Sequence, residues 1–353
     1  MFANQRYTQI GLRSHGRGIF IKEPVEGWEL GDKRVFEVEP NCLVLNIVFA
    51  WEQAVGRTDE SHAGLIASHR FPMYRPKENL CDIEFLRYFF LTPHGKHLLG
   101  LASPGGAGRN KTLGQKEFER LAIALPPLAE QKSIAEILST WDKAINTAEK
   151  LLANAEAQKR ALMQQLLTGR RRLRGFEGSE WVERDFATTF KVDNDKSSQV
   201  PKPQYLTNGE IPIVDQGREF IAGFTDQQSR YVRVPAIIFG DHTKVLKWVD
   251  FAFCPGADGV QVLKARSSTD IRFGYYLLQA TPLPDLGYSR HMRELKKVKF
   301  KMPISIDEQR SIAQLFAHTD RVLEHHKAQL STLGLEKRAL MQQLLTGRRR
   351  VIV

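Results

Sequence analysis

One long segment of the chain occurs twice. The fourteen residues Lys159–Arg172 return unchanged as Lys337–Arg350, a displacement of 178 residues in a chain of 353. At the same displacement Glu130-Gln131 falls on Glu308-Gln309. A period this long is the size of a domain and not that of a solenoid repeat. We therefore expect a tandem duplication in which each copy combines a globular segment with a helical one.

The repeated segments carry the apolar spacing of coiled-coil helices. From Ile134 and from Ile312, apolar residues recur at alternating steps of four and three, which is a heptad seam. Lys159 and Lys337 interrupt the seam at equivalent places, as polar residues that fix the register often do. The predicted seam residues are Ile134, Leu138, Trp141, Ile145, Leu152, Leu162 and Leu166 in the first copy, and Ile312, Phe316, Leu323, Leu330, Leu333, Leu340 and Leu344 in the second.

Capping signals predict where these helices begin and end. Pro127 suits the first turn of the first helix, and Ser305 with Glu308 forms a capping-box pattern for the second. Gly169 and Gly347 suit the position after the last turn, and the arginines that follow favour the negative end of the helix dipole. Each helix would contain about 40 residues and extend roughly 60 Å. A helix this long with one apolar stripe needs a partner, which is either its own copy, packed antiparallel, or a helix of a second chain.

Short β-rich runs with glycine and proline breaks predict a globular segment ahead of each helix. In the first segment we expect strands at Val35–Val38 and Leu43–Phe49, a turn between them at 39–41, and a helix with an aromatic face at Asp82–Leu91. In the second we expect strands at Ile211–Val214, Ala236–Phe239 and Gln261–Leu263, and a helix at Phe273–Gln279.

The predicted fold class is α/β (α+β), arranged as a pseudo-two-fold repeat. Two globular domains, residues 1–126 and 175–304, are each followed by a helical region, residues 127–174 and 305–353. The two globular segments share this layout but little sequence. They are expected to present different surfaces on the same scaffold.

Bulk composition favours a folded protein with a polyanionic partner. Apolar residues make up 42% and charged residues 26% of the chain, as in ordinary globular proteins. The net charge of +11 favours nucleic acid, because clustered lysine and arginine release counterions from phosphates, although many proteins are mildly basic. Cys42, Cys81 and Cys254 are expected to be buried thiols and not parts of a disulfide framework or zinc site. The start of the chain lacks a signal peptide and no apolar stretch is long enough to span a bilayer, so we expect a cytoplasmic protein with no membrane partner.

The run Leu125-Pro126-Pro127-Leu128-Ala129-Glu130-Gln131, followed by a long helix and by Lys159–Gly169, resembles the specificity subunit of type I restriction–modification enzymes. The second copy, from Met302-Pro303 to Gly347, resembles it equally, so the resemblance covers the whole chain. The segments Ser103–Thr112, Phe239–Thr243 and Gly256–Gly259 also look like parts of that family's target-recognition domains. The first domain departs from the pattern, because it lacks a close match to the Gly175-Phe176 … Trp181 opening of the second.

The resemblance implies a subunit without catalytic residues, in which two target-recognition domains alternate with two helical conserved regions. It implies a bipartite, asymmetric target in double-stranded DNA, with two modification (methyltransferase) subunits and two restriction (translocase–nuclease) subunits as partners. S-adenosylmethionine, ATP and Mg²⁺ would then be bound by those partner subunits, and this chain would hold no cofactor or metal. The paired helices would set the spacing of the half-sites, expected near one turn of DNA, about 34–36 Å.

Loops that combine glycine with basic or amide side chains are the expected sites of DNA contact, because arginine and lysine pair with guanine or phosphate and asparagine and glutamine pair with adenine. In the first domain these are Arg13, His15, Arg17, Gln53, His69, Arg70, Arg109, Asn110 and Lys111. In the second they are Gln216, Arg218, His242, Thr243, Lys244, Tyr288, Ser289, Arg290, His291 and Arg293. Asp241 and Asp258 are expected to orient neighbouring loop groups. The arginines at 170–172 and 348–350 are expected to contact phosphates or partner subunits, or to complement the helix dipoles.

Two patterns approach catalytic motifs but lack required parts. Gly105–Thr112 is close to a phosphate-binding loop, but Asn110 stands where glycine is needed and no apolar strand precedes it. Pro284-Asp285 followed by Glu294 and Lys296 is close to the metal site of a DNA nuclease, with a short gap. The alternative functions are therefore a stand-alone Mg²⁺-dependent nuclease and a coiled-coil scaffold without sequence preference.

Overall fold

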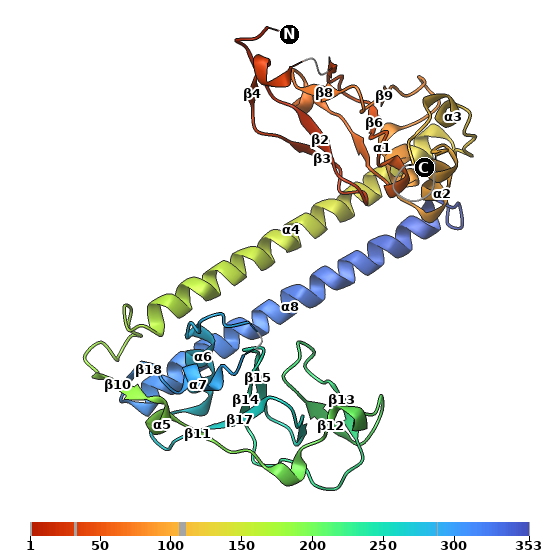
Figure 1. Ribbon diagram of the computed structural model, residues 1–353. Helices are drawn as coiled ribbons and strands as arrows, with labels where there is room; N and C mark the ends of the chain where they lie inside the picture. Colours follow the sequence, from red (N-terminus) through yellow and green to blue (C-terminus); the bar gives the residue numbers. More distant parts are fainter. Residues whose placement is uncertain (1, 32–33, 106–110, 288, 353) are drawn as a thin grey trace. The chain divides into compact units, whose positions relative to one another are not determined.

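Figure 1 shows a computed structural model of the chain, which describes residues 2–31, 34–105, 111–287 and 289–352. The chain divides into two compact units: unit 1 combines Met1–Glu149 with Ala328–Val353, and unit 2 is Lys150–Lys327. The long helices α4 (Leu128–Leu166) and α8 (Ile306–Leu344) each continue from one unit into the other. Each unit therefore contains one globular segment, the beginning of one long helix and the end of the other.

Unit 1 consists of short strands packed beside three helices. Antiparallel pairs form between β1 (Arg6–Tyr7) and β4 (Val25–Glu26), β2 (Ile10–Leu12) and β3 (Ile19–Ile21), and β5 (Val35–Glu37) and β8 (Ile66–Ser68). A three-stranded sheet has β6 (Leu43–Leu45) between β7 (Val55–Arg57) and β9 (Met73–Tyr74). The helices are α1 (Ile83–Phe90), α2 (Pro93–Leu101) and α3 (Gln115–Glu119). The largest core cluster joins β6 and β7 to α1, to the beginning of α4 and to the end of α8.

The predicted hairpin at residues 35–49 is wrong in one respect. Strands β5 and β6 form where expected, but they belong to different sheets, and β6 ends at Leu45 instead of Phe49. Strand β6 ends at Leu45 because an Asx turn follows it, in which the side-chain oxygen of Asn46 accepts a hydrogen bond from the Val48 N–H at 3.0 Å. The predicted helix is confirmed by α1, whose first turn is capped by Asp82.

Unit 2 contains a larger sheet than unit 1. Its four strands have the order β11–β17–β14–β15, formed by Phe190–Val192, Val260–Ala265, Ala236–Gly240 and Leu246–Val249. A three-stranded sheet has β12 (Ile211–Val214) between β13 (Gly223–Thr225) and β16 (Cys254–Pro255), and β10 (Trp181–Asp185) pairs with β18 (Lys299–Pro303). The helices are α5 (Phe186–Thr189), α6 (Ile271–Ala280) and α7 (Met292–Leu295). The predicted strands and the predicted helix of this segment are confirmed by β12, β14, β17 and α6.

The two long helices have the predicted length and the predicted ends. Each contains 39 residues. Gly169 and Gly347 both have φ of 71°, the left-handed conformation that glycine adopts without strain after a last helical turn. Every predicted seam residue is buried or partly buried, whereas most other positions of the helices are exposed. The predicted seam residues therefore lie on the less exposed face of each helix, and at the ends of the helices they pack on the globular segments.

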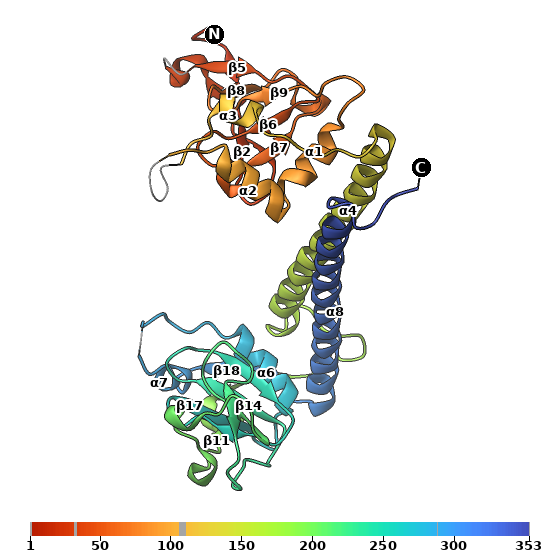
Figure 2. The same ribbon diagram turned by 90° about the vertical axis from the view of Figure 1, so that its right-hand side faces the viewer.

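The aromatic helices α1 and α6 attach to the long helices in the same way. Figure 2 shows α1 beside α4 in unit 1 and α6 beside α8 in unit 2. The backbone N–H of Asp82, before α1, donates to Gln131 Oε1 at 2.9 Å, and the N–H of Asp270, before α6, donates to Gln309 Oε1 at 2.8 Å. Gln131 and Gln309 are fully buried, and each amide nitrogen donates to two backbone carbonyls. These glutamines are equivalent in the repeat, so they join each globular segment to the beginning of its own long helix.

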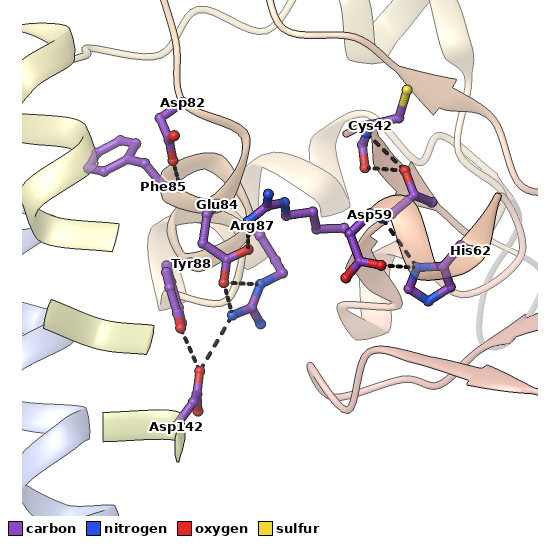
Figure 3. A network of polar contacts seen from close by, with 11 residues as sticks. Cys42, Asp59, His62, Asp82, Glu84, Phe85, Arg87, Tyr88 and Asp142 are labelled. Carbon is purple, nitrogen blue, oxygen red and sulfur yellow. Dashed lines mark hydrogen bonds and ion pairs between the residues drawn. The ribbon is translucent and has the colours of Figure 1, made fainter. Parts of the chain in front are cut away.

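In each unit an aspartate at the beginning of one long helix bonds to the seam lysine of the other. In unit 1 Asp142 accepts a hydrogen bond from Lys337. It also accepts one from the Tyr88 hydroxyl at 2.6 Å (Figure 3). In unit 2 Asp320 accepts from Lys159 at 2.5 Å and from the Tyr276 hydroxyl at 2.7 Å. Asp142 and Asp320 are equivalent in the repeat, as are Lys159 and Lys337. We call these the reciprocal contacts, because each copy supplies the acceptor in one unit and the donor in the other.

A second reciprocal pair engages two of the arginines that follow the long helices. Arg350 bonds to both carboxylate oxygens of Glu130, at 2.7 and 2.6 Å, and its equivalent Arg172 bonds to both oxygens of Glu308, at 2.8 and 2.7 Å. These side chains are thus occupied within the protein. The Glu308 side chain therefore does not close a capping box, although the Glu308 N–H donates to Ser305 Oγ at 3.3 Å. Both pairs require the beginning of one helix to lie beside the end of the other, so in each unit the two helices run antiparallel.

Asp142, Tyr88, Arg87 and Lys337 form a partly buried cluster of polar contacts. Burial of the Asp142 carboxyl would raise its pKa, but hydrogen bonds from Lys337 and Tyr88 hold this pKa below its ordinary value. Burial, together with the bond to Asp142, raises the pKa of Tyr88, which keeps the hydroxyl protonated and donating. Arg87 adds a further positive charge, 3.4 Å from the carboxylate, and is itself paired with Glu84 (Figure 3).

Replacing Asp142 with Asn should lower the free energy of unfolding by about 1–2 kcal/mol at pH 7, because Lys337 and Tyr88 lose a charged acceptor that is only partly exposed. Since the pKa of Asp142 is lower in the folded chain, its contribution is present above the unfolded value of about 3.9 and is lost as the pH falls through the folded value. Urea denaturation at pH 7 and pH 3 measures both effects, and the difference in stability between the two proteins should be smaller at pH 3 than at pH 7. Asp307→Asn, which changes an exposed pair with Arg310, is the control and should alter stability by less than about 0.5 kcal/mol.

Candidate nucleic-acid interface

In unit 2 the loop between β12 and β13, residues 215–222, meets the loop that follows β14. Gln216 Oε1 accepts a hydrogen bond from the His242 N–H at 3.1 Å, and the Gln216 carbonyl accepts from the Thr243 hydroxyl at 2.7 Å. Gly259 lies against the same glutamine in a left-handed conformation, with φ of 65°, and an added Cβ would come within 2.4 Å of Gln216 Nε2. The structure therefore brings together Gln216, His242 and Thr243, which the sequence placed on separate loops.

Asp241 joins the same loops to the segment around α7. Its N–H donates to the Gly259 carbonyl at 2.7 Å, and its carboxylate accepts from the Met292 N–H at 2.6 Å. Its carbonyl accepts from the His291 N–H at 2.8 Å. The expectation that Asp241 orients neighbouring loops agrees with these contacts. His291 is fully buried, so the structure corrects its inclusion among the DNA-contact candidates: the ring is packed inside the loop cluster.

A buried lysine lies beneath the β12–β13 loop. Lys247 on β15 is 4% exposed, and its ammonium donates to the carbonyls of Asp215 at 2.7 Å and Glu219 at 2.5 Å. Burial lowers the pKa of Lys247, although the negative charge of Asp215 opposes that shift. The neighbouring Trp248 points to the other face of the strand, where it packs with Tyr275 of α6. The pattern of the strand gave no signal for Lys247, because a lysine in a strand is usually exposed.

The other candidates of unit 2 remain at the surface. Arg218, Thr243, Arg290 and Arg293 are exposed, and Ser289 is partly exposed. Lys244 pairs with Asp285 at 3.2 Å, and that contact lowers the pKa of the Asp285 carboxyl. Tyr288 lies outside the described residues. The loops around Gln216 thus present several guanidinium groups on a surface fixed by internal hydrogen bonds.

In unit 1 the loop between β6 and β7, residues 46–54, corresponds to the β12–β13 loop of unit 2, because each leaves the middle strand of a three-stranded sheet. The tip of the β2–β3 hairpin binds to it, because the N–H groups of His15 and Gly16 donate to the carbonyls of Glu52 at 2.7 Å and Gln53 at 3.0 Å. From the other side the Ile47 N–H donates to the Arg70 carbonyl at 2.9 Å. The Lys111 ammonium lies 5.9 Å from the centre of the Trp51 ring. One loop therefore gathers the candidate segments of the first domain.

The candidates of unit 1 differ in how free their side chains are. Those that are exposed are Arg13, His15, Arg17, His69 and Arg70, and Lys111 is partly exposed. Gln53 is partly buried, and its amide nitrogen donates to the Phe90 carbonyl at 3.0 Å, at the end of α1. That bond gives Gln53 a structural role that its sequence context did not suggest. Arg109 and Asn110 lie outside the described residues.

The described residues supply no metal centre. Among residues 2–31, 34–105, 111–287 and 289–352, no group of three or more histidine, cysteine, aspartate or glutamate residues could hold an ion. Cys42 and Cys254 are buried and Cys81 is partly buried, and all three are free thiols. Within the same part of the chain, the helices are too short or too polar to cross a bilayer.

Comparisons with known proteins agree with this architecture. The model of the type I restriction modification DNA specificity domain matches residues 44–157. A putative specificity subunit of the type I restriction enzyme MjaX from Methanocaldococcus jannaschii is 24% identical over 79% of this chain and 71% of its own length. The MjaVIII specificity subunit of the same organism is 25% identical over 67% of this chain and 64% of its own length.

Solved structures show the same fold. The S subunit of a type I restriction–modification system from M. genitalium matches with a TM-score of 0.62 at 15% identity, over 88% of this chain and 84% of that one. A chain from a study of assembly and conformational transition in a type I system matches with a TM-score of 0.54 at 16% identity, over 97% and 92%.

The fold defines a class of proteins that carry two α/β domains on two long helices, with the contacts of one copy completed by the other. Within that class, residues 44–157 match the type I restriction modification DNA specificity domain, and the chain is similar over most of its length to specificity subunits of type I restriction enzymes.

Replacing Asp241 with Ala should lower the free energy of unfolding by about 1–3 kcal/mol, because the buried Met292 N–H loses its acceptor. Asp258→Ala is the matched control, since Asp258 is exposed in the neighbouring loop, and it should change stability by less than about 0.5 kcal/mol. Urea denaturation of both variants gives the comparison. Equal stability of the two would show that Asp241 does not join the loops.

Proposed function

We propose that this chain is a non-catalytic subunit that binds a bipartite, asymmetric sequence in double-stranded DNA. The observation that carries the proposal is the presence of two loop clusters at corresponding places, one around the β6–β7 loop and one around the β12–β13 loop, whose side chains differ. Exposed arginines in both clusters suit phosphate and guanine contacts. Because the clusters are unlike, the two half-sites should be unlike.

The long helices would set the separation of the two half-sites. Each is a continuous helix of 39 residues, or roughly 58 Å at 1.5 Å per residue. The reciprocal contacts fix the register of the helices in each unit, so the helices cannot slide past each other there without breaking these contacts. A fixed length of protein then selects a fixed number of base pairs between the half-sites.

The partners that fit this role are modification and restriction subunits, two of each. They would supply the methyl transfer, DNA translocation and cleavage, together with S-adenosylmethionine, ATP and Mg²⁺. Nothing in the described residues favours a nuclease site on this chain, since Asp285 is paired with Lys244 and Glu294 with Lys297. A scaffold without sequence preference would not need two loop clusters held by buried polar contacts.

Arg290→Ala should weaken binding to all DNA and reduce the slope of log affinity against log salt by about 1, if its guanidinium neutralises a phosphate. Fluorescence anisotropy with a labelled duplex, between low and moderate salt, measures the slope. Arg310→Ala is the control, because Arg310 is exposed on α8 and pairs with Asp307 away from the loops. An unchanged slope for Arg290→Ala would remove this residue from the interface.

Inserting one heptad into both long helices, after Glu149 and after Lys327, should preserve the seam and lengthen the spacer of the DNA target. Seven residues add roughly 10 Å, or about three base pairs. Mapping of methylated sites in cells that contain the chain and its modification subunits shows the motif. We expect the same two half-sites, separated by a longer spacer. A single continuous motif, or cleavage of DNA by the purified chain with Mg²⁺ alone, would contradict the proposed function.

A further inference from the structure

The β6–β7 loop and the β12–β13 loop are built alike, although their sequences differ. Each leaves the middle strand of a three-stranded sheet and leads to an edge strand. Each begins with an Asx turn: Asn46 accepts from the Val48 N–H at 3.0 Å, and Asp215 accepts from the Gly217 N–H at 2.7 Å. Each ends at an alanine, Ala54 or Ala222, directly before the edge strand. The two loops are therefore equivalent parts of the two units.

Each of these loops exposes a phenylalanine. Phe49 is 40% exposed and Phe220 is 46% exposed, whereas Phe85, Phe90, Phe190 and Phe239 are almost completely buried. A single exposed apolar side chain is common on protein surfaces. The same residue type exposed at equivalent loops, each among candidate DNA-binding groups, is a more specific observation. Arg218 lies in the same loop as Phe220, and Lys111 lies over Trp51 in the loop of Phe49.

Both phenylalanines stand on backbone that is held in place. The Phe49 N–H donates to the Asn46 carbonyl at 3.1 Å, and the Phe49 carbonyl accepts from the N–H groups of Glu52 at 3.0 Å and Ala54 at 3.1 Å. The β12–β13 loop is held at Gln216 by Thr243, and at Glu219 by Lys247. The edge of the Phe220 ring also meets Phe251, with the ring centres 6.0 Å apart. Neither ring therefore needs a loop rearrangement to meet a ligand.

The β12–β13 loop contacts the residues at both ends of β15. Its Gln216 end binds Thr243, before β15, and Phe220 lies on Phe251, after β15. The strand itself has four residues, or about 13 Å at 3.3 Å per residue, and successive base pairs are 3.4 Å apart. Figure 1 places β12 and β13 on the opposite side of unit 2 from β10 and β18. Gln216 and Phe220 thus lie at opposite ends of β15, and Arg218 stands between them in the chain, with a polar group at one end and an aromatic ring at the other.

We propose that Phe49 and Phe220 determine specificity, each at a thymine of its own half-site, through apolar contact with the thymine 5-methyl group in the major groove. That methyl group is the one apolar feature on the major-groove edges, and phenylalanine is among the side chains that contact it. The inference rests on the proposed DNA-binding function. It requires at least one A·T pair in each half of the target.

The test uses the full chain with its modification subunits. Methylated-site mapping with the wild type first defines both halves of the motif. Phe49→Ala should relax the motif in one half only, and Phe220→Ala in the other half only, so each variant is the control for the other. Val232→Ala, an exposed apolar residue in unit 2, should leave the motif unchanged. Phe220→Leu, which keeps an apolar contact with Phe251, should retain the motif if Phe220→Ala loses stability.

A second measurement addresses the methyl group directly. Uracil in place of each thymine of the defined target removes only the 5-methyl group, and at one position in each half it should weaken binding by about 4- to 10-fold. In Phe220→Ala the same replacement in its half should have no further effect, while replacement in the other half keeps its full effect. Equal uracil sensitivity of wild type and variant, or a half-site without A·T pairs, overturns the inference. If the wild type shows no motif at all, it is the proposed function that fails.

Discussion

The structure depends on the reciprocal contacts between the two copies of the repeat. A single helix of this length with one apolar stripe is not stable in water without a packing partner. Apolar packing alone would allow two such helices to pair in registers that differ by one heptad. Asp142 with Lys337, and Asp320 with Lys159, allow one register in each unit, because a shift would separate both partly buried lysines from the aspartates that neutralise them. The tyrosines of α1 and α6 bond to the same aspartates, so each globular segment is tied to both helices at one point.

In each unit the beginning of one long helix binds the residues that follow the end of the other. Glu130 and Glu308 begin the two long helices, and they bind the arginines that follow the end of the other helix. Neither unit is therefore formed by one copy of the repeat alone. The duplication of sequence produced two units that each need residues from both copies, although their loops have diverged.

In the loop clusters, buried polar contacts hold the loop backbone in position. A buried aspartate and a buried lysine, Asp241 and Lys247, hold the backbone of the candidate DNA-contact loops of unit 2 and leave Arg218 and Arg290 exposed at the surface. Sequence-specific binding needs side chains that are held in position before the ligand arrives. A rigid sheet with variable loops meets this need, since the loops can change in sequence while the strands and the helix contacts stay the same.

Local features of the fold were predictable from the sequence, and long-range ones were not. The seam, the glycine ends and the aromatic helices follow from periodicity and capping, which act within a few residues. The partners of Arg172 and Arg350 lie more than 130 residues away in the chain, and no local pattern names them. His291 and Gln53 show the same limit at the site, because both have the side-chain chemistry of DNA contact and both are used inside the protein.

Double-mutant cycles on Lys159 test the reciprocal contacts most directly. The repeat contains two equivalent aspartates, and the structure pairs Lys159 with Asp320 of the other copy and not with Asp142 of its own. Lys159→Met combined with Asp320→Asn should show a coupling free energy of about 1 kcal/mol in urea denaturation, and Lys159→Met combined with Asp142→Asn should be additive within about 0.3 kcal/mol. Coupling of Lys159 to Asp142, or none to Asp320, would contradict the account.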